Sequence, residues 1–212
     1  MQLYGRRSSI NVQKVLWCLG ELGLTEGADY RRVDAGLQFG VIDTPEYRAL
    51  NPNALVPTLV DGERAIWESN TILRYLATKH GAQGLLPAQA ADRSEVERWM
   101  DWQLGALWAT LRVAYLGLTR TPEAERDHAA IRASYAAAAR LLRIADQRLR
   151  THSHLALERF TLAEIGVALA AHRWYGLNER FGALLAPEPE MPSLALWLEA
   201  QRGRPAFPDA KG

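Results

Sequence analysis

The chain has 212 residues, 48% of them hydrophobic and 23% charged, which excludes a disordered protein and leaves material for two modest cores. Its 25 basic and 24 acidic residues leave a net charge of +1, so no overall field would attract nucleic acid or acidic lipid. One cysteine excludes a disulfide framework, and the sequence shows neither a signal-peptide h-region nor an apolar run that could span a bilayer. We therefore expect a soluble cytoplasmic protein with no nucleic-acid or membrane partner.

The first part of the chain alternates short strands with helices. Residues 2–4 indicate a strand, apolar residues recur at helical spacing over 11–22, and residues 29–35 indicate a second strand. A strand, a helix and a strand in this order predict a parallel β-α-β unit. Thr44 is then expected to cap a short helix that has Pro45 at its first position.

A hairpin and another helix follow. Residues 56–60 and 64–67 have strand character and flank Asp61-Gly62, a dipeptide that favours a tight β-turn. Ser69 is expected to cap the helix that comes next. After that helix, residues 81–91 form a polar stretch with glycine and proline, which is typical of a linker.

The remainder of the chain has helical patterns only. An apolar stripe from Trp99 to Leu118 predicts one long helix, and Thr121 is expected to begin the next. Thr161 and Glu164 match a capping box, and residues 192–201 predict a last helix. The expected organisation is a small α/β domain over 1–80, a linker over 81–91 and an all-helical domain over 92–212.

Pro57 is the unusual residue of the predicted hairpin, because proline cannot donate to a sheet ladder. A cis bond before Pro57 would turn the chain sharply and leave the N–H and C=O of Val56 available to an extended, peptide-like ligand. Glu68 could hold an ammonium group, while Ser69 and a helix N-terminus suit a carboxylate. Together these residues favour a short peptide with an α-amino acid head. The alternative is a loop proline, a solvated glutamate and an ordinary capping serine.

The sequence resembles the cytosolic glutathione S-transferases of the bacterial serine/asparagine type over nearly its whole length. The resemblance is carried, in this order, by "SSINVQKV", "NPNALVPTLVDG", "WESNTILRYL", "FTLAEI" and "RGRPAF". It implies a thioredoxin-like N-terminal domain joined to an all-α helical bundle, glutathione as co-substrate with no metal, and a homodimer. It also implies that Pro57 is cis, that Val56 pairs with the cysteinyl unit of glutathione, and that Glu68 and Ser69 hold its γ-glutamyl end.

The chemistry to be explained is thiol activation, since a free thiol has a pKa of about 8.5. A hydroxyl donor beside a helix N-terminus would favour the thiolate. By resemblance, Ser9 aligns with the activating hydroxyl, and Asn11 is a side chain that some bacterial relatives use beside it or instead. Ser9 could equally be only a helix cap, and the adjacent Ser8 competes for the role. Tyr4 is disfavoured because it falls in the preceding strand.

Two other residue types are expected to be inert. Cys18 lies inside a helical run and is expected to be a buried thiol. His152 and His154 resemble a pair of metal ligands, but further ligands are lacking nearby, so no metal site is predicted.

Two departures from the family pattern concern the substrate loop. Ala54 replaces a commoner glycine, so the loop must avoid positive φ or accept strain, and Leu55 replaces a polar contact residue.

The remaining ligand contacts are expected at two places. The glycyl end of glutathione is expected at the loop 36–41, with Gln38 as its candidate. Trp108, Arg112 and Tyr115 fall on adjacent helical turns and could line an apolar cleft with one cation for the second substrate. The alternative for these rings is a place in the core or at a dimer interface.

These features predict a detoxifying enzyme that activates glutathione for attack on a small hydrophobic electrophile. The reaction could be conjugation, peroxide reduction or displacement of a leaving group. The alternative is a non-catalytic glutathione-fold binding protein whose helical domain serves as a docking surface.

Overall fold

This computed structural model describes residues 1–185, 187 and 189–208, which fall into two compact units. The N-terminal unit comprises Met1–Ala88 together with the segment that begins at Arg204, and the helical unit comprises Gln89–Gly203. The division after Ala88 falls inside the stretch expected to be a linker. The segment from Arg204, expected in the helical domain, groups instead with the N-terminal unit.

The N-terminal unit is built on a mixed sheet of four strands in the order β2-β1-β3-β4. β1 is parallel to β2 and antiparallel to β3, and β3 and β4 form the expected hairpin. Leu3 and Leu59 are fully buried and face each other across the central pair of strands, which places apolar core at the middle of the sheet. The strand bounds are β1 (Gln2–Tyr4), β2 (Arg31–Val33), β3 (Thr58–Asp61) and β4 (Arg64–Trp67).

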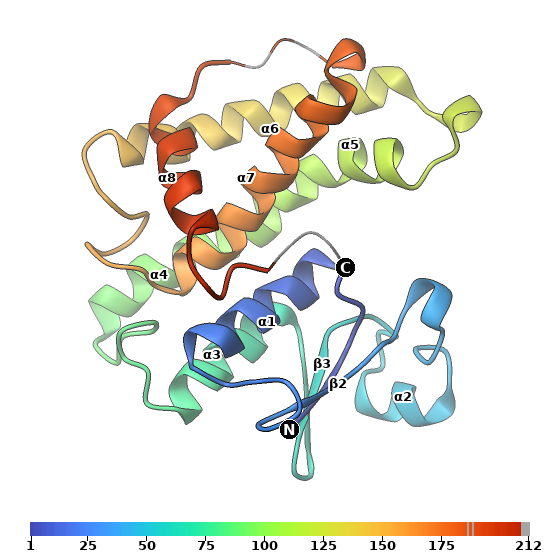
Figure 1. Cartoon of the computed structure of the whole chain (residues 1–212), viewed down its shortest axis with the longest axis vertical. Coiled ribbons are helices and arrows are strands. Elements are labelled where there is room, and N and C mark those ends of the chain that lie inside the picture. Colours follow the sequence, from blue (N-terminus) through green and yellow to red (C-terminus); the bar gives the residue numbers. More distant parts are fainter. Residues whose placement is uncertain (186, 188, 209–212) are drawn as a thin grey trace. The chain divides into compact units, whose positions relative to one another are not determined.

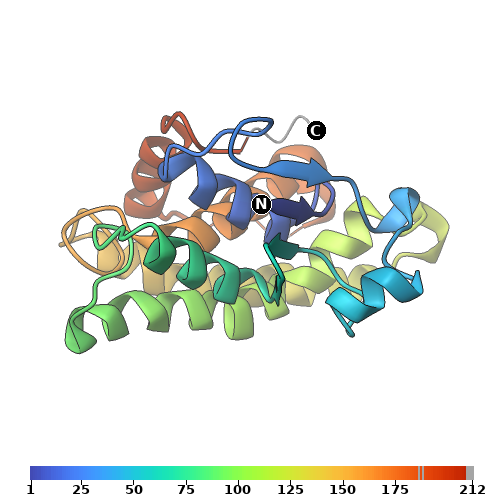
Figure 2. The ribbon, with the colours of Figure 1, turned by 90° about the horizontal axis from the view of Figure 1, so that it is seen from below.

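Three α-helices cover this sheet: α1 (Ile10–Glu21), α2 (Pro45–Leu50) and α3 (Ser69–Lys79). α1 and α3 pack against each other on one face of the sheet, and α2 lies on the opposite side (Figures 1 and 2). The apolar stripe of α1, which includes Val12 and Val15, is buried in this packing. The thioredoxin-like domain predicted from the sequence is confirmed.

The local signals of this unit are partly confirmed. The hydroxyl of Thr44 accepts a hydrogen bond of 3.2 Å from the Tyr47 N–H and so caps α2 as expected. The predicted cap of α3 is wrong, because Glu68 is the N-cap and Ser69 is already the first helical residue. β3 begins at Thr58, so Pro57 stands before the strand rather than within it. The missing N–H of proline therefore removes no ladder bond.

The segment from Arg204 packs along α1. The guanidinium of Arg204 donates to both carboxylate oxygens of Glu21, at 2.8 and 2.6 Å. The ring of Phe207 meets Trp17 edge-on, with centroids 4.8 Å apart. These contacts explain why residues 204–208 belong to the N-terminal unit.

The helical unit is a bundle with α7 at its centre. α7 packs against α4, α5, α6 and α8, and its residues 162–171 are all buried, which is why its sequence is apolar on every side. The all-helical C-terminal domain is confirmed. The helices are α4 (Ala90–Trp102), α5 (Ala109–Thr119), α6 (His128–Leu149), α7 (Leu162–Phe181) and α8 (Pro192–Arg202), with a π-helical segment, η2 (Gln103–Trp108), between α4 and α5. Single 3₁₀ turns are η1 (Leu37–Phe39), η3 (Glu123–Glu125) and η4 (Gly182–Leu184).

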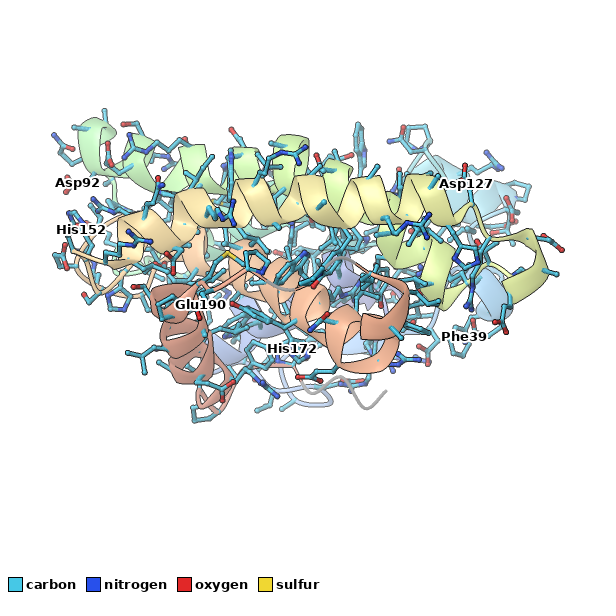
Figure 3. The ribbon with its side chains drawn as sticks, turned by 90° about the horizontal axis from the view of Figure 1, so that it is seen from above. Phe39, Asp92, Asp127, His152, His172 and Glu190 are labelled. Atoms are coloured by element: carbon cyan, nitrogen blue, oxygen red, sulfur yellow. The ribbon has the colours of Figure 1, made fainter. Side chains whose placement is uncertain are left out.

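Two helix boundaries in this unit differ from expectation. The predicted long helix is interrupted by η2, where the backbone widens to π geometry. The next helix begins at His128 and not at Thr121, because the carboxylate of Asp127 accepts the Ala130 N–H at 2.9 Å and caps α6 there. Figure 3 shows Asp127 at the beginning of α6 and His152 beyond its other end. Within the described residues, none of the helices has the length and apolar character needed to cross a membrane.

Candidate active site

Ser9 is the N-cap of α1 and has an extended backbone. Its carbonyl oxygen accepts the Gln13 N–H at 2.9 Å, which starts the helix. Its side chain makes no capping bond, and across the described residues its hydroxyl has no hydrogen-bond partner. Ser9 is 7% exposed, whereas Ser8 is exposed. The Ser9 hydroxyl is thus left available at the N-terminus of α1, where partial positive charge gathers.

A side-chain hydrogen bond joins the first turns of α1 and α3. The hydroxyl of Ser69 donates to the amide oxygen of Asn11 at 3.3 Å. Ser69 is buried and Asn11 is half-buried. Because the first N–H groups of a helix have no intrahelical acceptor, two sets of donors are brought close together here. Three residues predicted for the site, Ser9, Asn11 and Ser69, are therefore neighbours in the fold.

Glu68 holds an unusual backbone conformation directly before α3. Its φ is 69°, in a region that residues other than glycine rarely occupy, and its side chain makes no capping bond. Such conformations persist where the surroundings fix them, and they concentrate at ligand sites. The side chain is exposed, so its carboxylate lies open beside the helix N-terminus.

Lys14 is a residue of this region that sequence reasoning missed. It is fully buried on α1, and its ammonium donates to the Asn70 amide oxygen at 3.3 Å. Burial lowers the pKa of Lys14 to about 7, while attraction to Glu68 raises it. The signal in the sequence was its spacing of four from both Ile10 and Cys18, which puts a charged side chain on the buried face of the helix.

The bond between Val56 and Pro57 is cis, as the family resemblance implied. Val56 is half-buried, and within the described part of the chain neither its N–H nor its C=O has a hydrogen-bond partner. Its side chain lies between two glycines: a Cβ placed on Gly5 would be 3.4 Å from Val56 Cβ, and one on Gly36 would be 3.6 Å from Cγ1. Val56 thus borders both the β1–α1 loop and the loop that starts at Gly36.

The loops next to Val56 contain other residues that were singled out in the sequence. Ala54 accepts the left-handed conformation, with a φ of 52°, and does not avoid it. Gln38 is exposed on η1, and among the described residues it makes no hydrogen bond. Leu55 is 63% exposed, so its apolar side chain occupies the surface where relatives were expected to have a polar group. Tyr4 lies in β1, and its ring packs edge-on against Tyr47.

In the helical unit, two of the three residues expected to meet the second substrate lie together. The rings of Trp108 and Tyr115 have centroids 5.6 Å apart. The cation on these rings is Arg173 of α7, whose guanidinium lies 5.4 Å from Trp108 and 4.6 Å from Tyr115. Arg112, the third residue expected to meet the second substrate, is exposed.

The expected burial of Cys18 is confirmed. Cys18 is fully buried, and its burial, together with the Glu21 charge, raises the pKa of the thiol to about 12. His152 is engaged by the guanidinium of Arg148 at 2.7 Å. In the part of the chain that the structure describes, no three His, Cys, Asp or Glu side chains gather as metal ligands.

The chain is similar in sequence to known proteins. Residues 3–84 match the family model of the glutathione S-transferase N-terminal domain. Glutathione S-transferase GstB of Escherichia coli (strain K12) is 37% identical over 206 residues, which cover 96% of this chain and 94% of that protein. The chain belongs to the glutathione S-transferase family.

Other relatives of this glutathione S-transferase agree with the assignment. Glutathione S-transferase 3 of Zea mays is 31% identical over 211 residues, covering 98% of this chain and 91% of that protein. The crystal structure of a theta class glutathione S-transferase from Xanthomonas axonopodis pv. citri, with glutathione bound, superposes with a TM-score of 0.88 at 41% identity. That match covers 97% of this chain and 94% of the other. It confirms the thioredoxin-like and helical parts of this glutathione S-transferase as the fold of the family.

Proposed function

We propose that this protein is an enzyme that binds glutathione on its N-terminal unit and activates the thiol for attack on a small hydrophobic electrophile. The observation that carries the proposal is the Ser9 hydroxyl, which has no partner among the described residues and stands at the N-terminus of α1. The Asn11–Ser69 hydrogen bond supports it, because it brings a second helix N-terminus to the same place.

The proposed chemistry is stabilisation of the thiolate. The thiol loses its proton to water, the Ser9 hydroxyl donates a hydrogen bond to the resulting thiolate, and the partial charge of the α1 N-terminus favours the anion. Lowering the thiol pKa by about two units requires roughly 2.7 kcal/mol of preferential interaction with the anion, which one charge-assisted hydrogen bond can largely supply. The amide N–H₂ of Asn11 is the second donor at this position, while its oxygen is held by Ser69.

The rest of glutathione is proposed to lie along the same surface. The N–H and C=O of Val56, beside Pro57, pair with the cysteinyl main chain in the manner of an added strand. Glu68 holds the α-ammonium group. The backbone N–H of Ser69, at the N-terminus of α3, holds the adjacent carboxylate, while the Ser69 hydroxyl keeps its bond to Asn11. Gln38 on the exposed turn η1 meets the glycyl end.

The electrophile is proposed to meet Trp108, Tyr115 and Arg112. Conjugation, peroxide reduction and displacement all start from the same thiolate, so the site supports each of them as a reaction class. We propose further that the protein acts in detoxification, in the cytoplasm, as a homodimer, and without a metal.

The test combines binding with turnover. Glutathione affinity is measured by titration calorimetry, and activity is measured with a panel of aryl halides and hydroperoxides. We expect binding together with turnover of at least one panel member. Binding without any turnover would favour the non-catalytic binding protein, and an absence of binding would reject the proposed function.

A further inference from the structure

Three polar side chains are buried behind the loop that ends at Pro57. They are Tyr47 of α2, Asn51 just after it, and Thr58 at the start of β3, with exposed fractions of 2%, 2% and 0%. Burial raises the pKa of the Tyr47 hydroxyl, which keeps it protonated and able to donate. Burying polar atoms costs folding free energy unless each of them makes a hydrogen bond.

Two of them bond to the carbonyl oxygen of Leu55, and Thr58 bonds to both of these two. The Tyr47 hydroxyl donates to this oxygen at 2.6 Å, and the Asn51 amide nitrogen donates to it at 2.9 Å. The same amide lies 3.0 Å from the Thr58 hydroxyl, which in turn lies 2.8 Å from the Tyr47 hydroxyl. The directions of these hydrogen bonds follow from the number of protons. The one hydroxyl proton of Tyr47 is used in the bond to the Leu55 carbonyl, so the Tyr47 oxygen accepts from the Thr58 hydroxyl. The Thr58 oxygen in turn accepts from the Asn51 amide.

The loop around this carbonyl is tied down in a second way. The Asn51 amide oxygen accepts the Asn53 N–H at 3.0 Å, and the Asn51 carbonyl accepts the Ala54 N–H at 3.0 Å. Leu55 as a residue is 63% exposed, but its carbonyl group faces the buried side chains. Two buried side chains donate to that carbonyl oxygen, and both of its lone pairs are used.

The consequence falls on the next residue. The peptide unit between Leu55 and Val56 is trans and planar, so the N–H of Val56 points opposite to the C=O of Leu55. Fixing the carbonyl in the buried cluster therefore aims the Val56 N–H away from that cluster. This is the N–H group that has no partner among the described residues.

We infer that Tyr47, Asn51 and Thr58 are positioning residues that hold the Leu55–Val56 peptide plane so that the Val56 N–H faces the cysteinyl carbonyl of glutathione. The inference rests on the proposed function. These side chains do not touch the ligand. They act by fixing the Val56 N–H before glutathione binds, so that less conformational entropy is lost when this group pairs with the main chain of glutathione.

The decisive variant is Tyr47→Phe, which removes one oxygen and keeps the ring. We expect glutathione affinity to fall about tenfold by calorimetry and KM for glutathione to rise by a similar factor. The kcat at saturating glutathione and the pKa of the bound thiol stay unchanged, because this contact is equally present in the ground and transition states. If the Tyr47 hydroxyl had only a structural role, its loss would lower the unfolding temperature, but KM for glutathione would not rise selectively at constant kcat.

The matched control is Tyr75→Phe, which removes a hydroxyl that donates to Asp61 at the same distance of 2.6 Å in the same unit. Its affinity for glutathione is expected to equal that of the wild type. If Tyr47→Phe fails to fold, Thr58→Val takes its place and should weaken glutathione binding about threefold, since it removes the partner that orients the Tyr47 hydroxyl.

The outcomes separate the two levels of the hypothesis. A wild type that binds glutathione, with Tyr47→Phe and Thr58→Val binding it equally well, overturns the positioning role alone. A loss of affinity in Tyr75→Phe as large as that in Tyr47→Phe also overturns the positioning role. A wild type that binds no glutathione overturns the proposed function, and the positioning role with it.

Discussion

The hydroxyl of Ser69 donates to the amide oxygen of Asn11 at 3.3 Å, although the two residues are 58 positions apart in the sequence. Asn11 lies in the first turn of α1 and Ser69 begins α3, so this bond fixes the spacing between two helix N-termini. In the proposed site one N-terminus faces the sulfur of glutathione and the other faces its γ-glutamyl carboxylate. In that proposal, the bond sets how far apart the two N-termini lie along the ligand.

Ser69→Ala should weaken glutathione binding by about threefold to tenfold. The change keeps the backbone N–H of residue 69 that faces the ligand carboxylate, but it removes the hydroxyl that holds Asn11, and one such hydrogen bond contributes about 0.5–1.5 kcal/mol. Titration calorimetry with glutathione measures the effect. Ser94→Ala is the control, because the Ser94 hydroxyl only donates to the Ala91 carbonyl in the first turn of α4. Equal affinity for both variants and the wild type would reject the role given to Ser69.

Ser9→Ala should raise the pKa of the bound thiol by about one to two units, because the charge-assisted hydrogen bond to the thiolate is lost. The thiolate absorbs in the ultraviolet, so a pH titration of the complex reads this pKa directly. Ser8→Ala serves as the comparison, since Ser8 is the adjacent hydroxyl. A thiol pKa that moves in Ser8→Ala and stays constant in Ser9→Ala would transfer the activating role to Ser8.

Much of this fold follows from short-range signals in the sequence. Asp61-Gly62 predicts the hairpin, Thr44 and Pro45 predict the start of α2, and Thr161 with Glu164 predicts the start of α7; all are observed. In each case the deciding interaction lies within a few residues of the chain, so local chemistry contains the answer.

The misses have a common physical cause. Ser69 was expected to cap α3, but the Ser69 hydroxyl bonds to a distant residue and Glu68 takes the cap position. Arg173, a cation over the rings of Trp108 and Tyr115, comes from another helix and was not foreseen. Lys14 joins Asn70 from a separate helix. Each of these partners is chosen by tertiary packing, which the spacing within one helix does not specify.

Gln103→Met should stabilise the protein by about 1 kcal/mol, or about 2–4 °C in the unfolding temperature. Gln103 is fully buried in η2, and within the described residues neither atom of its side-chain amide has a hydrogen-bond partner. Methionine keeps the length of the side chain and removes this desolvation cost. Gln147→Met on the exposed side of α6 is the control and should leave stability unchanged. A lower unfolding temperature for Gln103→Met would show that the amide has partners in solution.

Glu164 at the start of α7 should make stability depend on pH. Its buried carboxylate accepts hydrogen bonds of 2.8 Å from the N–H and the hydroxyl of Thr161 and from the Leu155 N–H. Burial raises the pKa of Glu164 from 4.5 to about 7, and these hydrogen bonds oppose the rise. The folded protein thus keeps a proton that the unfolded chain releases, so the unfolding free energy falls as pH rises from 4.5 to about 7.

Glu164→Gln tests this directly. The variant should be less stable throughout, because its N–H₂ group replaces an acceptor that faces N–H donors. Glutamine does not titrate, so the difference in unfolding free energy between wild type and variant should become smaller as pH rises from 4.5 to about 7. Urea unfolding across that range measures the gap, with Glu179→Gln on the exposed end of α7 as the control. A gap that stays constant with pH would mean that Glu164 is ionised throughout, because its three hydrogen bonds outweigh the effect of burial.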